Sequence, residues 1–370
     1  MHEVHKGHIR PSSINWFIPD FESPFYGGIN TIFRFADQFQ ERFGVKNRFL
    51  VVGSGPEEFI RSGMRLAFPA LEQKSEIVVS PRLMHDPDRE TPWADVSIAT
   101  FWLTAYALSR VRSTKRKFYF IQDYEPIFYP AGTTSALTEQ SYRMGLYGIC
   151  NTKTLKEIYE GIYGGRGTFF VPALDGKVFH PRERLSRGDR PYRVFLYARP
   201  SHPRNCYELA ATALRGLKES LREGVEIVTA GSWVPLEGKH DDDFMHHLGL
   251  LDYAETAELY RTCDVGLVLS VSRHPSYLPL ELMASGCLVV SNFNPATTWL
   301  LKHEENSLLS PPLAERLHLA MERGLRDDGL RQRLVNNGLT TIQANHSSWE
   351  PWIEKVFRYL CDPEGSSSSE

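Results

Sequence analysis

Residues 264–290 read DVGLVLSVSRHPSYLPLELMASGCLVV, and this stretch decides the fold class. The β-rich run Asp264–Leu269 predicts a strand, and the apolar spacing over Pro279–Ser285 predicts a helix that starts after a proline-containing turn. Leu288–Ser291 predicts a second strand. Two strands joined by a helix run in the same direction, because the crossover returns the chain to the starting edge of the sheet. The stretch therefore predicts an α/β fold with a parallel sheet.

The same alternation extends toward the N-terminus from this stretch. Strands are predicted at Tyr192–Ala198 and Val225–Ala230, and helices at Asn205–Glu223 and Glu255–Thr262. Together with residues 264–291 these elements make a doubly wound unit.

The first half of the chain predicts a separate α/β domain of the same kind. It opens with a strand at Ser13–Ile18, a glycine turn at Gly27-Gly28 and a helix whose apolar residues recur at helical spacing. Further strands are predicted at Asn47–Val52, Asp95–Phe101, Lys117–Gln122, Leu146–Asn151 and Thr168–Val171. Residues 175–190 are charged and lack strand periodicity, so they are interpreted as a connection. We expect domains at 1–178 and 190–346, followed by an amphipathic helix within 347–364 that needs an apolar surface to cover.

Composition excludes several classes of protein. The 370 residues are 42% hydrophobic and 24% charged, with a formal net charge of −3, which is ordinary for a globular chain and too acidic for a dedicated nucleic-acid binder. The five cysteines are widely spaced and form no CxxC pair, which favours a reducing compartment over a disulfide framework or a zinc site. The polar start and the short apolar run at 96–109 match neither a signal peptide nor a bilayer span. We therefore expect a cytoplasmic protein.

The segment Ser272–Val290 closely resembles the nucleotide-sugar site of glycosyltransferase family 4. The resemblance implies a GT-B fold, with two Rossmann-like domains facing across a cleft and a C-terminal helix crossing back to the first domain. Glu281 matches the second glutamate of the family's Glu-x7-Glu pair, which holds the donor ribose, while N–H groups at the helix start meet the diphosphate. The alternative is that Glu281 only complements the helix dipole.

One position departs from the family's pattern. Arg273 stands where the first glutamate of the pair is expected, and it precedes a His-Pro-Ser-Tyr turn that is similar to rhamnosyltransferase-type members, which build bacterial surface glycans. The departure puts in question how the hydroxyls of the donor sugar are held. By resemblance, the donor-binding candidates of this turn are Arg273, His274, Ser276, Tyr277 and Leu278.

Two arginines follow the first strand of the second domain. In the family, an Arg after this strand and a basic residue five positions later grip the donor diphosphate, and Arg199 and Arg204 have that spacing. The leaving nucleoside diphosphate gains negative charge as the glycosidic bond breaks, so fixed cations stabilise the transition state. The alternative is a pair of surface arginines. In the same domain, Gly231 and Leu248 lie in segments similar to the family's nucleobase pocket.

The first domain offers fewer candidates. Gly27 and Gly28 match the family's glycine loop, and glycines there let the backbone approach a donor phosphate closely. Asp123 follows a predicted strand and is the candidate for a catalytic contact with the donor sugar or the acceptor. A role for Glu125 instead, or a purely structural turn, is nearly equal in weight.

Three other patterns favour weaker hypotheses. Gly53–Glu58 begins like a dinucleotide fingerprint but carries Glu58 where a third glycine is needed. Asp241–Asp243 contains the Asp-x-Asp of metal-dependent transferases but is more typical of a solvated loop, so no metal site is expected. The basic run 110–117 is typical of a solvated helix end, with contact to an anionic membrane surface as the alternative.

The resemblance implies a retaining, metal-independent hexosyltransferase. Its donor would be a nucleoside-diphosphate sugar, with dTDP-rhamnose as first guess and UDP-glucose as second, and its acceptor a hydroxyl of a glycan or a lipid-linked saccharide. No cofactor and no nucleic-acid partner are implied. Two alternatives stay open: a non-catalytic nucleotide-sugar-binding subunit, and a sugar-nucleotide epimerase of the same fold.

Overall fold

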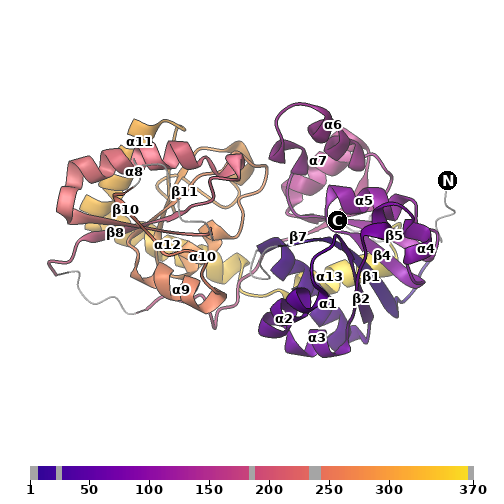
Figure 1. The fold of residues 1–370 in the computed structure, drawn as a ribbon. Coiled ribbons are helices and arrows are strands. Elements are labelled where there is room, and N and C mark those ends of the chain that lie inside the picture. The colour runs from indigo at the N-terminus through magenta and orange to yellow at the C-terminus, as the bar shows by residue number, and fades with distance from the viewer. Residues whose placement is uncertain (1–6, 22–26, 183–187, 233–242, 366–370) are drawn as a thin grey trace. The chain divides into compact units, whose positions relative to one another are not determined.

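The chain folds into two units (Figure 1). The structure, a computed structural model, describes residues 7–21, 27–182, 188–232 and 243–365. The first unit contains Met1–Pro172 and Trp349–Glu370, and the second contains Ala173–Ser348. The first unit is therefore built from two separate stretches of the chain, and the second from the stretch between them.

A seven-stranded parallel sheet forms the centre of the first unit, in the order β3-β2-β1-β4-β5-β6-β7. Its strands are β1 (Ser13–Pro19), β2 (Lys46–Val52), β3 (Glu76–Val79), β4 (Ala94–Ala99), β5 (Thr114–Ile121), β6 (Tyr147–Asn151) and β7 (Arg166–Phe170). Its helices are α1 (Gly27–Phe43), α2 (Glu57–Ala67), α3 (Pro69–Lys74), α4 (Pro87–Glu90), α5 (Trp102–Ser109), α6 (Thr133–Ser141), α7 (Lys153–Tyr163) and α13 (Glu350–Cys361), with short 3-10 helices at Pro81–Met84 and Glu125–Phe128.

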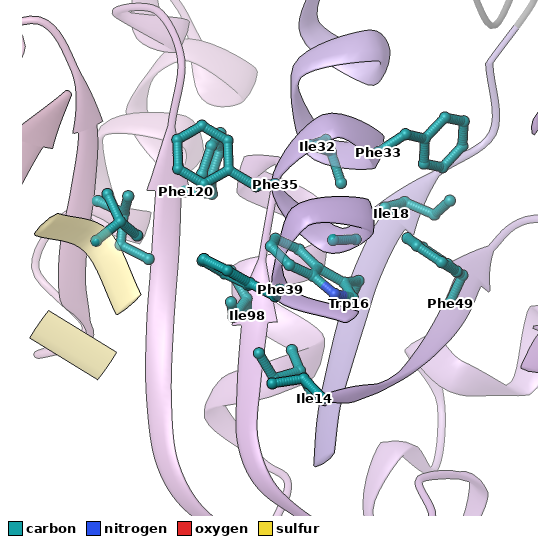
Figure 2. Close-up of a cluster of buried hydrophobic side chains, with 14 of the residues drawn as sticks. Ile14, Trp16, Ile18, Ile32, Phe33, Phe35, Phe39, Phe49, Ile98 and Phe120 are labelled. Carbon is teal, nitrogen blue, oxygen red and sulfur yellow. The ribbon is translucent and has the colours of Figure 1, made fainter. Parts of the chain in front are cut away.

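An aromatic core lies between this sheet and α1 (Figure 2). Trp16 of β1 is fully buried, and its indole Nε1 donates to Oδ1 of Asn47 at 2.8 Å. Phe33, Phe35 and Phe39 of α1 belong to the same buried cluster, and the rings of Trp16 and Phe39 stack with centroids 6.3 Å apart. Each buried aromatic ring removes a large apolar area from water, so this face supplies much of the unit's stability.

Helix α13 completes the same core from the far end of the chain. Ile353, Val356, Phe357 and Leu360 pack in the cluster that contains Trp16. The ring of Phe357 stacks on that of Phe43 of α1, with centroids 3.8 Å apart. The amphipathic C-terminal segment therefore covers the sheet of the first unit.

Arg116 fastens the end of α13 to the sheet. Its guanidinium, on β5, is buried and donates to the backbone carbonyls of Leu360 (3.0 Å), Cys361 and Gly7. Desolvation lowers the pKa of Arg116, but the carbonyl dipoles at a helix C-terminus favour a cation there. Arg116 therefore is not one of the solvated charges that the basic run 110–117 suggests.

The second unit contains a six-stranded parallel sheet in the order β10-β9-β8-β11-β12-β13. Its strands are β8 (Tyr192–Tyr197), β9 (Val225–Ala230), β10 (Met245–His247), β11 (Val265–Val268), β12 (Leu288–Asn292) and β13 (Leu308–Ser310). Its helices are α8 (Tyr207–Leu221), α9 (Tyr253–Thr262), α10 (Leu278–Ala284), α11 (Ala314–Arg326) and α12 (Asp328–Asn345), with 3-10 helices at Pro203–Asn205, Arg222–Gly224 and Pro295–Thr297. Two doubly wound parallel sheets of this kind confirm the predicted fold class of two Rossmann-like domains.

Several features differ from the sequence predictions. The unit division after Pro172 comes earlier than the predicted boundary at 178, because Leu174 and Phe179 pack in the core of the second unit. Strand β4 ends at Ala99 rather than at residue 101, because Phe101 caps helix α5 and its N–H bonds to Oγ1 of Thr104 at 3.0 Å.

Three short edge strands and two long helices are absent from the predictions. The prediction did not assign the edge strands β3, β10 and β13, nor the helices α11 and α12. Strands of three or four residues are too short for an alternating pattern to register.

Candidate functional site

The strand order of the second unit reverses between β8 and β11, which are hydrogen-bonded neighbours. Later strands are added outward on each side of this pair, so the loops after β8 and β11 diverge at their carboxyl ends. Ligands of open α/β sheets bind at such a switch point. Arg199 follows β8, and the turn Ser270–Tyr277 follows β11, so both predicted donor segments leave the sheet at this place.

The loop after β8 brings both predicted arginines beside Tyr197. Arg199 hydrogen-bonds to the hydroxyl of Tyr197, and Arg204 lies within electrostatic reach of the same ring. Burial raises the pKa of Tyr197, Arg199 and Arg204 oppose that rise, and Glu281 adds to it. One tyrosine hydroxyl therefore feels all three charged residues, which places Arg199, Arg204 and Glu281 in one neighbourhood.

Backbone hydrogen bonds link the two loops at the switch point. The N–H of His202 donates to the carbonyl of Arg199 (3.0 Å), and the N–H of Val271 donates to the carbonyl of Arg204 (3.3 Å). Both arginine side chains are half-buried. The loop that carries the cations is thus attached directly to the turn after β11.

Asparagines on and after β12 fix the turn after β11. Asn292 accepts from the N–H of Ser270 (2.9 Å) and donates to its carbonyl (3.0 Å). Asn294 donates to the carbonyl of Ser272 at 2.7 Å. Because these amides satisfy the backbone of the turn, the side chains that follow are presented from a well-supported base.

His274 is a buried neutral imidazole with one unused donor. Its side chain is 4% exposed, and its Nδ1 accepts from the N–H of Ser276 at 2.9 Å. Burial lowers the pKa of His274 to about 3, so Nε2 carries the single proton. Among the described residues, that Nε2 has no hydrogen-bond partner. Ser276 adopts φ +64°, a left-handed conformation that is costly for a serine and shapes the turn.

Glu281 lies near the start of α10, where Pro279 occupies the first turn. Its side chain is half-buried, and desolvation raises the pKa of Glu281 to about 7. Within the described part of the chain, no hydrogen bond or ion pair to its carboxylate is found. A half-buried acceptor of this kind lacks the partners that such groups ordinarily have, and ligand hydroxyls would supply them.

The other residues of the turn lie nearer the surface. Arg273 is exposed, and among the described residues its guanidinium makes no ion pair, so the structure does not join it to Glu281. Tyr277 and Leu278 are half-buried at the beginning of α10, and Ser276 is exposed. Arg273, which stands where the family's first glutamate is expected, therefore forms no buried ion pair with Glu281.

Of the two predicted base-pocket residues, Gly231 lies against Tyr197. Gly231 follows β9 with φ +118°, and a Cβ there would lie 2.4 Å from Cε2 of Tyr197. Its N–H donates to the carbonyl of Gly249 (2.9 Å), and the N–H of Leu248 donates to that of Thr229 (2.8 Å). Only glycine allows this close approach, so Gly231 leaves the room that the ring of Tyr197 occupies.

Sequence reasoning missed His247. Its Nδ1 lies 2.8 Å from Oγ1 of Thr229, and its Nε2 is buried without a partner. The signal available in the sequence was weak, because a histidine in a three-residue strand has no recognisable motif around it.

In the first unit, the glycine turn begins helix α1, whereas Asp123 lies in the turn after β5. Gly27 and Gly28 begin α1, and a Cβ on Gly28 would lie 3.4 Å from Nε2 of Gln122, an ordinary contact distance. Asp123 is half-buried, and its Oδ1 accepts from the N–H of Tyr124 at 2.7 Å. Asp123 therefore supports the turn after β5 with one oxygen of its carboxylate.

Glu125, the alternative to Asp123, is structural. It is 3% exposed, and its carboxylate accepts from the N–H of Trp102 (2.8 Å) and the hydroxyl of Tyr119 (3.0 Å). Burial raises the pKa of Glu125 to about 8. Both carboxylate oxygens are engaged in fixing the start of α5, so the hypothesis of a sugar contact by Glu125 is not supported.

The weaker sequence patterns have local explanations. The N–H of Ser54 in the glycine loop donates to Oδ2 of Asp20 at 3.1 Å, so an internal carboxylate occupies that loop. Of the Asp-x-Asp pattern, Asp241 and Asp242 lie outside the described residues. Among the residues that are described, no cluster of histidine, cysteine or carboxylate side chains suited to a metal ion is found. A search of the same residues for helices able to span a bilayer gives none.

Comparison with known proteins agrees with this geometry. Residues 13–153 match the family model of the WsaF N-terminal domain, and residues 192–322 match that of the WsaF C-terminal domain. The chain is 40% identical over 354 residues to the O-antigen biosynthesis protein RfbC of Myxococcus xanthus, a match that covers 95% of this chain and 27% of RfbC. It is 29% identical over 104 residues to the uncharacterized glycosyltransferase MJ1607 of Methanocaldococcus jannaschii, covering 28% of this chain and 26% of that protein. The chain thus spans about a quarter of the length of these relatives.

Solved structures share the fold at low sequence identity. Anabaena HepE in complex with UDP-glucose superposes with a TM-score of 0.70 at 14% identity, covering 96% of this chain and 99% of HepE. TarM gives 0.73 at 8% identity, over 94% and 98% of the two chains. WaaG, a glycosyltransferase involved in lipopolysaccharide biosynthesis, gives 0.67 at 13% identity, over 94% and 99%. The chain therefore has the GT-B glycosyltransferase fold and contains the N-terminal and C-terminal domains of the WsaF family, in that order.

Proposed function

We propose that this chain is a retaining glycosyltransferase that moves a hexose from a nucleoside-diphosphate donor to a hydroxyl of a glycan or a lipid-linked saccharide. One observation carries the proposal: Arg199, Arg204 and Glu281 all act electrostatically on the hydroxyl of Tyr197, and the loops that carry them leave the sheet at the switch point of the second unit. The two arginine cations suit the diphosphate of a nucleotide. The Glu281 carboxylate, which has no hydrogen-bond or ion-pair partner among the described residues, suits the ribose.

Each residue has a physical role in this proposal. Arg199 and Arg204 neutralise the diphosphate and stabilise the charge that it gains as the glycosidic bond breaks. Each charge-assisted hydrogen bond to the diphosphate contributes about 1.5–3 kcal/mol. Glu281 accepts hydrogen bonds from the ribose hydroxyls. The unused Nε2–H of His274 donates to a donor oxygen, and its low pKa keeps it a donor of fixed protonation across the working pH range.

Further parts of the proposal come from resemblance and from the relatives. The first unit binds the acceptor, and Gly27, Gly28 and Asp123 are its candidate contacts with the substrates. The donor is dTDP-rhamnose or, second, UDP-glucose, and the named roles of RfbC and WaaG in O-antigen and lipopolysaccharide synthesis support a surface glycan as the product. Two fixed guanidinium groups at the diphosphate make the reaction independent of a metal. The proposed location is the cytoplasm, with peripheral contact to the inner membrane face.

Calorimetric titration with dTDP, UDP, GDP, ADP and NAD in EDTA tests the proposal. We expect one nucleoside diphosphate to bind the wild type, and Arg199→Ala to weaken that binding about 10- to 100-fold. Arg316→Ala is the matched control, because Arg316 is an exposed arginine on α11 of the same unit. Binding of NAD alone, or of nothing, contradicts the proposal, and turnover of the sugar nucleotide without acceptor would indicate an epimerase instead.

A further inference from the structure

The carboxyl ends of β5 and β6 carry a group of buried polar atoms that have no partner among the residues the structure describes. These atoms are Oε1 of Gln122, both Oδ1 and Nδ2 of Asn151, and Oγ1 of Thr152. Asn151 is 1% exposed and Thr152 is 2% exposed. The pairing of Ile121 with Cys150 places Gln122 and Asn151 at neighbouring register positions, one residue beyond the pair.

Among the described residues, Asn151 differs from Asn47, another buried strand asparagine of the same sheet. Asn47 of β2 is equally buried, but its Oδ1 accepts from Trp16 at 2.8 Å and its Nδ2 donates to the carbonyl of Ala36 at 2.9 Å. A buried donor or acceptor that lacks a partner is rare in folded proteins and destabilises them. Thr152 is strained as well, because its φ of +95° is an outlier for a β-branched residue.

Side-chain alternation assigns Gln122 and Asn151 to one face of the sheet. Phe120 and Ile149, two residues earlier in β5 and β6, belong to the core shared with α1. Successive residues of a strand alternate between faces, so Gln122 and Asn151 point to the α1 side as well. The contact between Gln122 and Gly28 agrees with this, because Gly28 stands at the start of α1. The polar group therefore borders the first turn of α1, where the apolar core ends.

The chemistry of the group points to its ligand. Two primary amides carry no net charge, and each offers one acceptor beside two donors. Adjacent hydroxyls of a sugar ring offer the complementary donors and acceptors. A phosphate or carboxylate ligand would instead require cations or a run of free N–H donors.

We propose that Gln122 and Asn151 form a subsite for the hydroxyls of a neutral sugar ring, the terminal residue of the acceptor saccharide. The subsite rests on the proposed function for its role, but its ligand class follows from the unpaired atoms themselves. Binding supplies the partners that the folded chain lacks, which explains why an otherwise destabilising group persists.

Saturation-transfer NMR on the full chain tests the subsite. The probes are methyl α-L-rhamnoside and the methyl glycosides of D-glucose, D-galactose and D-mannose. We expect at least one probe to bind the wild type and Asn151→Leu to weaken that binding at least tenfold, with Gln122→Ala acting in the same direction. Because Asn151→Leu removes an unpaired amide, its Tm should be equal to or higher than that of the wild type.

Asn47→Leu is the matched control, since it removes a partnered amide of the same sheet. It should lower Tm while sugar binding per folded molecule stays unchanged. Failure of every probe to bind the wild type overturns the subsite, as does equal binding by wild type and Asn151→Leu. A Tm loss in Asn151→Leu as large as that in Asn47→Leu also overturns it, because it shows that internal water satisfies the amide as part of the fold.

The outcome is separable from that of the proposed function. Calorimetry with nucleoside diphosphates on the same samples should give the same affinity for wild type and Asn151→Leu. If a glycoside binds through Asn151 and no nucleotide binds, the transferase proposal fails and the sugar subsite stands.

Discussion

Replacing Glu281 by glutamine distinguishes two roles for its carboxylate, binding of a ligand and interaction with the helix dipole. The carboxylate is half-buried and has no partner in the described part of the chain, and burial raises the pKa of Glu281 from 4.5 to about 7. A raised pKa means that the folded state holds the proton more tightly than the unfolded state. The folded state is therefore progressively destabilised as pH rises from about 4.5 to about 7, and the whole penalty is present above pH 7.

The size of the penalty follows from the pKa. A rise from 4.5 to about 7 corresponds to roughly 3 kcal/mol. Partial exposure of the side chain screens the charge, so about 1–2 kcal/mol is a realistic expectation. Glu281→Gln should therefore raise Tm by about 2–8 °C at pH 8 and change it little at pH 4.5. Thermal unfolding at both pH values measures the difference.

Ligand binding should change in the opposite direction. Loss of the charged acceptor weakens the hydrogen bonds to ribose by about 1.5–3 kcal/mol, which lowers nucleotide affinity about 10- to 100-fold at pH 8. Glu315→Gln is the control, because Glu315 lies exposed in the first turn of α11 and interacts only with that helix dipole. If Glu281→Gln lowers Tm at pH 8 as the control does, and nucleotide affinity is unchanged, then Glu281 is only a dipole partner and the reasoning is refuted.

Three further perturbations test other parts of the structure. Gly231→Ala should lower the free energy of unfolding by about 1–3 kcal/mol in urea titrations and weaken nucleotide binding, because the added Cβ would displace Tyr197 and with it Arg199. Unchanged nucleotide binding would show that Gly231 does not support the site. Arg116→Met should cost about 3 kcal/mol of unfolding free energy, because three buried carbonyls lose a charged donor, and a neutral result in the same titration contradicts that role. His274→Ala should weaken nucleotide-sugar binding about tenfold at every pH from 5 to 8, because the imidazole stays neutral throughout; a pH-dependent loss would show that it titrates.

The candidate site residues named from the sequence are those that have a chemical signature along the chain. Arg199, Arg204 and Glu281 follow strands at a recognisable spacing, and the structure gathers them around Tyr197. The role of Tyr197 itself was not predictable, because a tyrosine at the end of a buried strand is indistinguishable from a core residue. The placement of its ring depends on Gly231, which lies more than thirty residues away and approaches only after β9 has paired with β8.

Unpaired polar groups were invisible to sequence reasoning for a different reason. Asn151 ends a predicted strand, and Asn47 begins one, so the two asparagines look alike in the sequence. One is satisfied by Trp16 and Ala36, and the other has no partner, a difference that only tertiary packing creates. Glu125 shows the converse, since a carboxylate at a promising strand end proves to be fully engaged in holding α5.

The return of α13 to the first unit sets an order for folding during synthesis. All of the second unit, Ala173–Ser348, leaves the ribosome before Ile353, Val356, Phe357 and Leu360 do. The second unit can therefore reach its native packing first, whereas the sheet around Trp16 waits with part of its apolar face uncovered. Domains usually fold from the N-terminal side as they emerge, and exposed apolar surface in a waiting intermediate favours aggregation. In this chain the unit that is translated first is the one that is finished last.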